Sequence, residues 1–172
     1  GSEGSGVLIE RLIGKEKVAF VWTAAHVVAG LRSTREVVDS KTGTKRVVVE
    51  FKDAAIVREL VEDGRRVGEI EMTAKVVKYS DADDGEDLAL LMVNKRNYAE
   101  ASAEFYREEG KLIVPISTRL LHVGSLMGQV GSNSMTAGVM SQMGRMIGKK
   151  ECGRATVTAF PGSSGGGVYL ED

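Results

Sequence analysis

The sequence predicts an all-β protein, a barrel or a sandwich, divided into two halves. Most segments alternate apolar and polar residues with a period of two, as half-buried strands do. Glycine is abundant, with 21 of the 172 residues, whereas proline occurs only 2 times. This balance favours many turns between short strands over a disordered linker. Hydrophobic residues make up 42% of the chain, which is enough to bury the core of one domain.

The first half is expected to open with a hairpin. Its arms would be residues 6–13 and 17–24, joined by the short turn Gly-Lys-Glu. In residues 69–77, four apolar side chains fall on one face and four polar side chains on the other. The further strands predicted in this half are 45–51, 69–77 and 87–93.

A short helix is expected over residues 97–110. Tyr98, Ala101 and Phe105 would share one helical face, and Gly110 stands where a C-terminal cap would be. This helix would connect the two β halves. The strands predicted in the second half are 111–116, 125–131, 135–142, 154–160 and 166–170.

Composition excludes several classes of function. With 23 basic and 24 acidic residues the net charge is −1, which gives no reason to expect nucleic acid as a partner. The apolar runs are too short to cross a bilayer, and no signal peptide is visible, so the compartment stays open. Cys152 is the single cysteine, so no internal disulfide forms. Without a Cys/His cluster, neither a metal nor an organic cofactor is implied.

Only two histidines are available as a catalytic base. His26 follows a predicted strand in "FVWTAAHVVAG", where small residues would let the chain turn beneath the imidazole. In this context a structural and a functional role are about equally well supported. His122, in "LLHVGS", is expected to be a surface-loop residue without a partner.

Asp87 and Ser164 are the candidate partners of His26. Asp87 immediately precedes the apolar strand "LALLMV", so its carboxylate would be partly buried and would need a hydrogen-bond donor. Ser164 is the central serine of "PGSSGGG", where glycines allow the unusual backbone of an oxyanion hole. Taken alone, Asp87 is more often a turn residue and the glycine-rich stretch more often a linker.

The order of the three residues is a stronger indication than any one of them. His26 and Asp87 are 61 positions apart and Asp87 and Ser164 are 77 apart. The first two fall in the first half and the third in the second, so the predicted site lies between the halves. The N–H groups of Gly162 and Ser164 would bind the oxyanion.

Three motifs, "TAAH", "DLALL" and "PGSSGG", resemble those around the catalytic His, Asp and Ser of chymotrypsin-like (trypsin-like) serine proteases. The similarity is greatest to the HtrA/Deg branch, through "GSGVLI", "LHVGSLMGQVGS" and "MTAGVMSQMGR". Ser163 and Gly167 depart from that branch, which has asparagine and proline there. Neither departure removes a catalytic group.

This resemblance implies two six-stranded antiparallel Greek-key barrels within one protease domain. The N-terminal half would be residues 1–95, the helical linker 96–110 and the C-terminal half 111–172. The resemblance also implies strands before Gly4 and after Asp172, so the ends look incomplete.

As to function, the resemblance implies a serine endopeptidase acting on protein or peptide substrates. Thr158 would lie near the base of the S1 pocket, and an uncharged residue there favours a small or aliphatic P1 residue. Two alternatives stay open, a catalytically silent scaffold with this fold and a latent protease that needs activation. The sequence leaves a homo-oligomer open.

Overall fold

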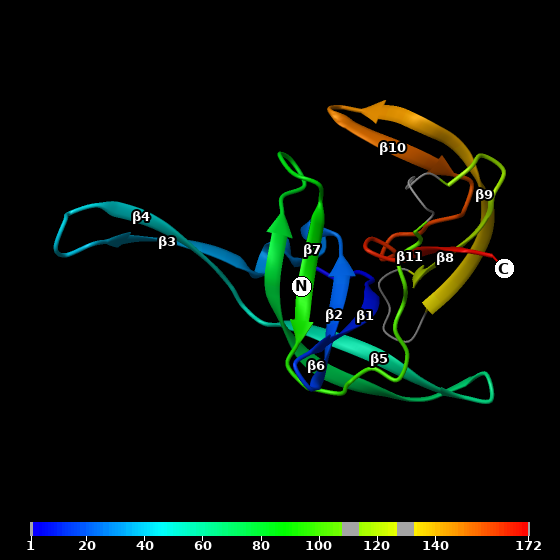
Figure 1. Cartoon of the computed structure of the whole chain (residues 1–172), viewed down its shortest axis with the longest axis horizontal. Helices are drawn as coiled ribbons and strands as arrows, with labels where there is room; N and C mark the ends of the chain where they lie inside the picture. Colours follow the sequence, from blue (N-terminus) through cyan, green and yellow to red (C-terminus); the bar gives the residue numbers. More distant parts are fainter. Residues whose placement is uncertain (1, 108–113, 127–132, 172) are drawn as a thin grey trace.

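The all-β class is confirmed by the computed structural model, which describes residues 2–107, 114–126 and 133–171. The strands of these residues form a five-stranded, a four-stranded and a two-stranded antiparallel sheet. The five-stranded and four-stranded sheets lie side by side, one from each half of the chain (Figure 1). In the described part, helical structure is limited to α1 (Ala25–Val28) and the 3-10 helix η1 (Ala29–Leu31).

The five-stranded sheet carries the main core. Its order is β1-β2-β7-β6-β5, with β1 (Val7–Ile13), β2 (Glu16–Thr23), β7 (Leu88–Val93), β6 (Arg65–Ser80) and β5 (Ala54–Glu62). Alanines at 19, 74 and 89 are fully buried where β2, β6 and β7 lie together. The predicted apolar face of residues 69–77 is confirmed, because Ile70, Met72, Ala74 and Val76 belong to this core or pack against it.

The four-stranded sheet has the order β10-β9-β8-β11. It consists of β10 (Lys150–Ala155), β9 (Asn133–Ile147), β8 (Arg119–Ser125) and β11 (Gly167–Leu170). The expectation that His122 lies in a surface loop is wrong. His122 belongs to β8, where buried positions alternate through Leu120, His122 and Gly124.

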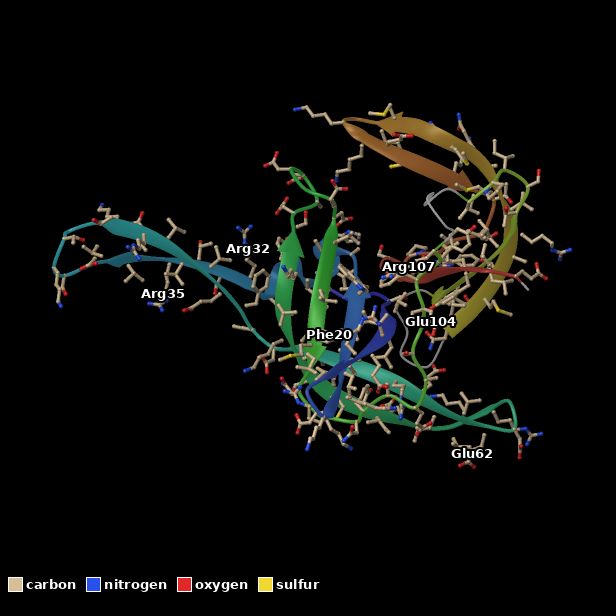
Figure 2. All side chains as sticks on the ribbon, viewed as in Figure 1. Phe20, Arg32, Arg35, Glu62, Glu104 and Arg107 are labelled. Atoms are coloured by element: carbon tan, nitrogen blue, oxygen red, sulfur yellow. The ribbon has the colours of Figure 1, made fainter. Side chains whose placement is uncertain are left out.

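A two-stranded ribbon projects from the body of the molecule. It consists of β3 (Arg32–Val38) and β4 (Lys45–Phe51). Figure 1 shows it standing clear of both sheets, and Figure 2 labels Arg35 along it. At its root, Phe51 packs on Tyr79 at 5.1 Å between ring centroids, and the Arg32 guanidinium lies over the same ring. The sequence predicted β4 but missed β3, since the mostly exposed "RSTREVV" has no apolar alternation.

The helix expected over 97–110 is wrong for residues 97–107, which contain no helix; residues 108–110 lie outside the described part. Tyr98 is only 5% exposed and packs in the core. The Ala103 amide donates to the Leu8 carbonyl at 2.8 Å, and the Phe105 ring meets the Trp22 ring edge-on. Contacts with β1 and β2 therefore replace the helix that the alanines and glutamates favoured.

The second half also departs from the expected strands. Residues 114–116 are not in a strand, while 111–113 and 127–131 lie outside the described part. Of the predicted strand 154–160, only Arg154 and Ala155 are in a strand. Beyond Ala155 the Thr156 amide still donates to the Val139 carbonyl at 2.9 Å, but the Val139 amide donates to the Thr156 hydroxyl, at 2.9 Å, and not to a backbone carbonyl. The assigned pairings of the described residues also fall short of two six-stranded barrels, and the predicted domain boundaries stay predictions.

Candidate active site

His26 is presented by a sharp turn at the end of β2. Thr23 ends the strand with a buried side chain, and the one-turn helix α1 follows at once. Ala25 and Val28 are buried on the inner side of α1, whereas His26 points outward with half of its side chain exposed. The small alanines before His26 therefore let the backbone turn tightly while the imidazole stays accessible.

Asp87 holds this turn and the imidazole together. Its Oδ2 lies 2.8 Å from His26 Nδ1, and its Oδ1 accepts from the His26 amide at 3.0 Å. The Ala25 amide donates to the Asp87 carbonyl as well, at 3.2 Å. Asp87 has a φ of +53°, a left-handed conformation that aspartate tolerates better than most residues.

The charge of Asp87 is stabilised by its partners. Burial raises the pKa of this carboxyl, whereas the hydrogen bonds from the His26 ring and amide lower it. The charges of His26 and Lys150 act in the same direction, so the pKa of Asp87 lies below its ordinary value. A carboxylate in this position orients the imidazole with Nδ1 as the donor, which leaves Nε2 to act as a base.

The glycine-rich stretch forms a tight turn instead of a linker. The Ser163 amide donates to the Phe160 carbonyl at 3.0 Å, with Pro161 and Gly162 between them. Gly162 has a φ of +93°. Proline followed by a glycine of positive φ is the pattern of a type II turn. Within the described residues, the amides of Gly162 and Ser164 have no hydrogen-bond acceptor.

This loop lies against the strand end that precedes His26. A Cβ at Gly165 would collide with the Ser5 carbonyl and the Thr23 hydroxyl, and would come within 2.8 Å of the Ala24 amide. Gly165 has a φ of +86°, so both space and backbone conformation require glycine there. Among the described contacts, Ser164 and His26 share no hydrogen bond. Such bonds are often long before substrate binds and shorten afterwards.

The position of Gly124 and His122 beneath the loop was not predicted from the sequence. A Cβ at Gly124 would come within 3.0 Å of the Ser163 side chain, and one at Gly166 within 3.1 Å of His122 Nε2. Buried His122 therefore lies under the loop that carries Ser164. The alternation of Leu120, His122 and Gly124 along β8 was a signal for this burial.

Ser5 is the other residue that the sequence did not single out. Its amide donates to the Ser164 carbonyl and its hydroxyl to the Gly162 carbonyl, both at 2.8 Å. No local pattern marks such a residue, because its partners are more than a hundred positions away.

Thr158 precedes the loop with an exposed side chain. Its carbonyl accepts from the Thr136 hydroxyl at 2.6 Å, which ties this segment to β9. The structure thus brings His26 and Asp87 together, places the Ser164 loop against the strand before His26, and leaves the Thr158 side chain open to solvent.

Comparison with known proteins identifies the fold and the family. The sequence profile described as "Trypsin-like peptidase domain" matches residues 4–172. The chain belongs to this trypsin-like peptidase family. The crystal structure of Deg5 resembles the trypsin-like chain with a TM-score of 0.53 and 20% identity, over 98% of this chain and 75% of Deg5. No curated protein matches the sequence.

The family match confirms the resemblance to trypsin-like peptidases, and the likeness to Deg5 shows a shared fold. Trypsin-like peptidases act on proteins, so protein or peptide substrates follow from the family. The described residues contain no group of three or more His, Cys, Asp or Glu side chains that could hold a metal ion. In the same part of the chain no helix has the length and apolar character to cross a membrane.

Proposed function

We propose that this trypsin-like peptidase is a serine endopeptidase in which His26, Asp87 and Ser164 form the catalytic triad. The observation that carries the proposal is the His26–Asp87 pair, whose ring-to-carboxylate distance is 2.8 Å. A histidine at a strand end, without a catalytic partner, often has only a structural role. A histidine oriented through Nδ1 by a carboxylate, beside a glycine-lined serine loop, fits acyl transfer.

In the proposed reaction, His26 Nε2 takes the proton of the Ser164 hydroxyl as Ser164 Oγ attacks the substrate carbonyl carbon. The scissile C–N bond then breaks, and the imidazolium gives this proton to the leaving amine. Water attacks the acyl-enzyme in the same way and releases the carboxylic acid product. Asp87 stays ionised throughout and stabilises the imidazolium.

The oxyanion of each tetrahedral intermediate would be bound by the amides of Gly162 and Ser164. Both amides lack an acceptor among the described residues. Gly162 is the third residue of the type II turn pattern of residues 160–163, and Ser164 directly follows that turn. One such donor typically contributes about 3–4 kcal/mol to transition-state stabilisation. Thr158, which is uncharged, is proposed to favour a small or aliphatic P1 residue.

Labelling with a fluorophosphonate probe tests the proposal. The wild-type chain should be labelled, and mass spectrometry should place the adduct on Ser164. Ser164→Ala and His26→Ala should abolish labelling. Ser163→Ala is the matched control, because it removes the neighbouring hydroxyl, which donates to the Phe160 carbonyl at 2.6 Å, and it should still be labelled.

Two outcomes separate the alternatives. If a folded wild-type chain is labelled neither alone nor with added peptide, the protease hypothesis fails and a binding role for the fold is favoured. If labelling occurs only after a peptide is added, the chain is a latent protease.

A further inference from the structure

Ser5 forms hydrogen bonds with three segments that are far apart in the sequence. It lies just before β1, and its hydroxyl donates to the Gly162 carbonyl at 2.8 Å while accepting from the Ser125 amide at 2.7 Å. Its amide donates to the Ser164 carbonyl at 2.8 Å. Its carbonyl accepts from the Thr23 hydroxyl at 2.7 Å. Every polar group of Ser5 is therefore used.

Two of these bonds hold the loop on either side of one peptide. Ser5 holds the carbonyls of Gly162 and Ser164, and the peptide that contains the Ser164 amide lies between them. The Ser163 carbonyl of that peptide accepts from the Gly166 amide at 2.8 Å. The direction of the Ser164 amide is thus fixed by bonds before, within and after its own peptide.

The other two bonds of Ser5 connect this loop to the rest of the site. Thr23, which is buried, ends the strand that leads to His26. Ser125 ends β8, the strand beneath the loop. Ser5 therefore connects the strand before the proposed base with the loop of the proposed nucleophile, across both sheets.

The hydroxyl is suited to this position because it donates and accepts at once. Without it, a half-buried carbonyl at Gly162 and an amide at Ser125 would lose their partners. There is little room for compensating movement. A Cβ at Gly4 would come within 2.5 Å of the Val27 side chain and 3.0 Å of the Ser164 carbonyl, and one at Gly6 would collide with Val21.

We propose that Ser5 is a positioning residue, which holds the Ser164 amide in the direction needed to bind the oxyanion. The proposal rests on the proposed function of the loop. It differs from that function in assigning a role to an N-terminal residue outside the triad and outside the oxyanion donors. Its effect on catalysis acts entirely through Gly162 and Ser164.

The test compares variants that differ in the hydroxyl. Ser5→Ala removes the hydroxyl. Ser5→Thr and Ser5→Val introduce side chains of nearly the same shape, of which only threonine has a hydroxyl. Ser141→Ala is the control, because the Ser141 hydroxyl also donates to a backbone carbonyl, that of Arg154 at 3.0 Å, in the β9–β10 hairpin. Each variant is examined by thermal unfolding, by fluorophosphonate labelling rate and by amide hydrogen exchange of residues 160–166.

We expect Ser5→Ala and Ser5→Val to lower the labelling rate by about tenfold to a hundredfold, since misplacing a catalytic donor costs this order of rate. The exchange of the Ser163 and Gly166 amides should quicken by about tenfold, while exchange in β2 and β7 stays at the wild-type rate. Ser5→Thr should stay closer to wild type than Ser5→Val in both measurements. Ser141→Ala should match wild type.

Wild-type rates for Ser5→Ala in both measurements would overturn the proposal. It would also be overturned by faster exchange throughout the chain, which would mean that Ser5 stabilises the whole fold. The exchange measurement does not depend on activity. If the wild-type chain is never labelled, the proposed function fails, while faster exchange confined to residues 160–166 would still show that Ser5 holds the loop.

Discussion

At the scale of single residues, Asp87 combines an unusual backbone conformation with three hydrogen bonds to the α1 turn. Its positive φ is energetically unfavourable, and such a conformation persists only where the contacts around it hold the backbone in place. The carboxylate meets both the ring and the amide of His26, so it fixes the position and the rotation of the imidazole. Replacing the Asp87 carboxylate by an amide of the same shape tests how much the reactivity of the site depends on its charge.

Asp87→Asn should keep the fold and lose most of the reactivity of Ser164. The amide side chain can still accept from the His26 amide, but its NH₂ group favours the imidazole tautomer with the proton on Nε2. In trypsin-like sites this change lowers turnover by about 10⁴-fold. The fluorophosphonate labelling rate measures the loss, and circular dichroism checks folding. Labelling within a factor of ten of wild type would remove Asp87 from the triad.

The lowered pKa of Asp87 also makes stability depend on pH. Because the folded-state pKa lies below the ordinary value of 3.8, the unfolded chain binds a proton more readily. The stabilisation is therefore complete above the unfolded-state pKa and is lost as pH falls through the folded-state pKa.

Urea unfolding of the wild-type chain and of Asp87→Asn between about pH 2 and pH 7 measures this contribution. The difference in unfolding free energy should be constant above about pH 5 and should shrink toward pH 2. A difference that grows as the pH is lowered would contradict the expected sign.

At the scale of elements, the loop after Pro161 requires glycine at position 165 for two reasons, a positive φ and the lack of room for a Cβ. Gly14, in another turn, has only the first of these. Gly14 and Gly165 both have positive φ, +64° and +86°. Gly14 lies in the β1–β2 turn, where a Cβ would meet nothing within 4 Å, whereas a Cβ at Gly165 would meet Ser5 and Thr23.

Gly14→Ala should therefore cost only the backbone term, about 1 kcal/mol. Gly165→Ala adds a collision with the Thr23–Ser5 bond, so its total should exceed about 2 kcal/mol. It should also slow labelling of Ser164, which Gly14→Ala should not. Chemical denaturation and labelling of both variants make the comparison. Equal costs at the two positions would mean that the loop does not pack tightly on β2.

The same scale explains which elements could be predicted. Strands over residues 45–51 and 87–93 were predicted from their apolar residues alone, and the structure has β4 at Lys45–Phe51 and β7 at Leu88–Val93. The helix over 97–110 was wrong because propensity is a weak local term, whereas Tyr98 contributes a buried ring to the core. β3 was missed because its mostly exposed residues show no apolar alternation, and β5 because its burial depends on pairing with β6, which no local pattern indicates.

The candidate site residues could be named from the sequence, whereas several of the elements around them could not. His26, Asp87 and Ser164 could be named because their chemical types and their order are both restrictive. Ser5 and His122 could not, since the role of each comes from contacts across the sheets. Short sequence motifs indicate the chemical groups of the site, whereas the contacts that hold those groups in place can be identified only from the three-dimensional structure.

At the scale of the whole molecule, the described contacts include no hydrogen bond between the β3–β4 ribbon and His26, Asp87 or Ser164. The outer face of the ribbon carries Val38, Val47 and Val49, which are exposed, and Val47 reaches 66% exposure. Its fixed contacts lie at its root, where Arg32 and Phe51 meet Tyr79. Since Ser33 pairs with Glu50 in register, residues 34–49 can be replaced by Asn-Gly, a dipeptide that closes two-residue hairpins.

This shortened chain should fold like the parent, because the removed side chains bury little surface and a shorter loop costs less entropy to close. The melting temperature should change by no more than about 3 °C, and the labelling rate of Ser164 should stay within about twofold, since no bond to His26 or Asp87 is lost. Differential scanning calorimetry and fluorophosphonate labelling measure the two quantities. A large loss of labelling at an unchanged melting temperature would mean that the ribbon shapes the site, and its exposed valines would then be the residues to substitute next.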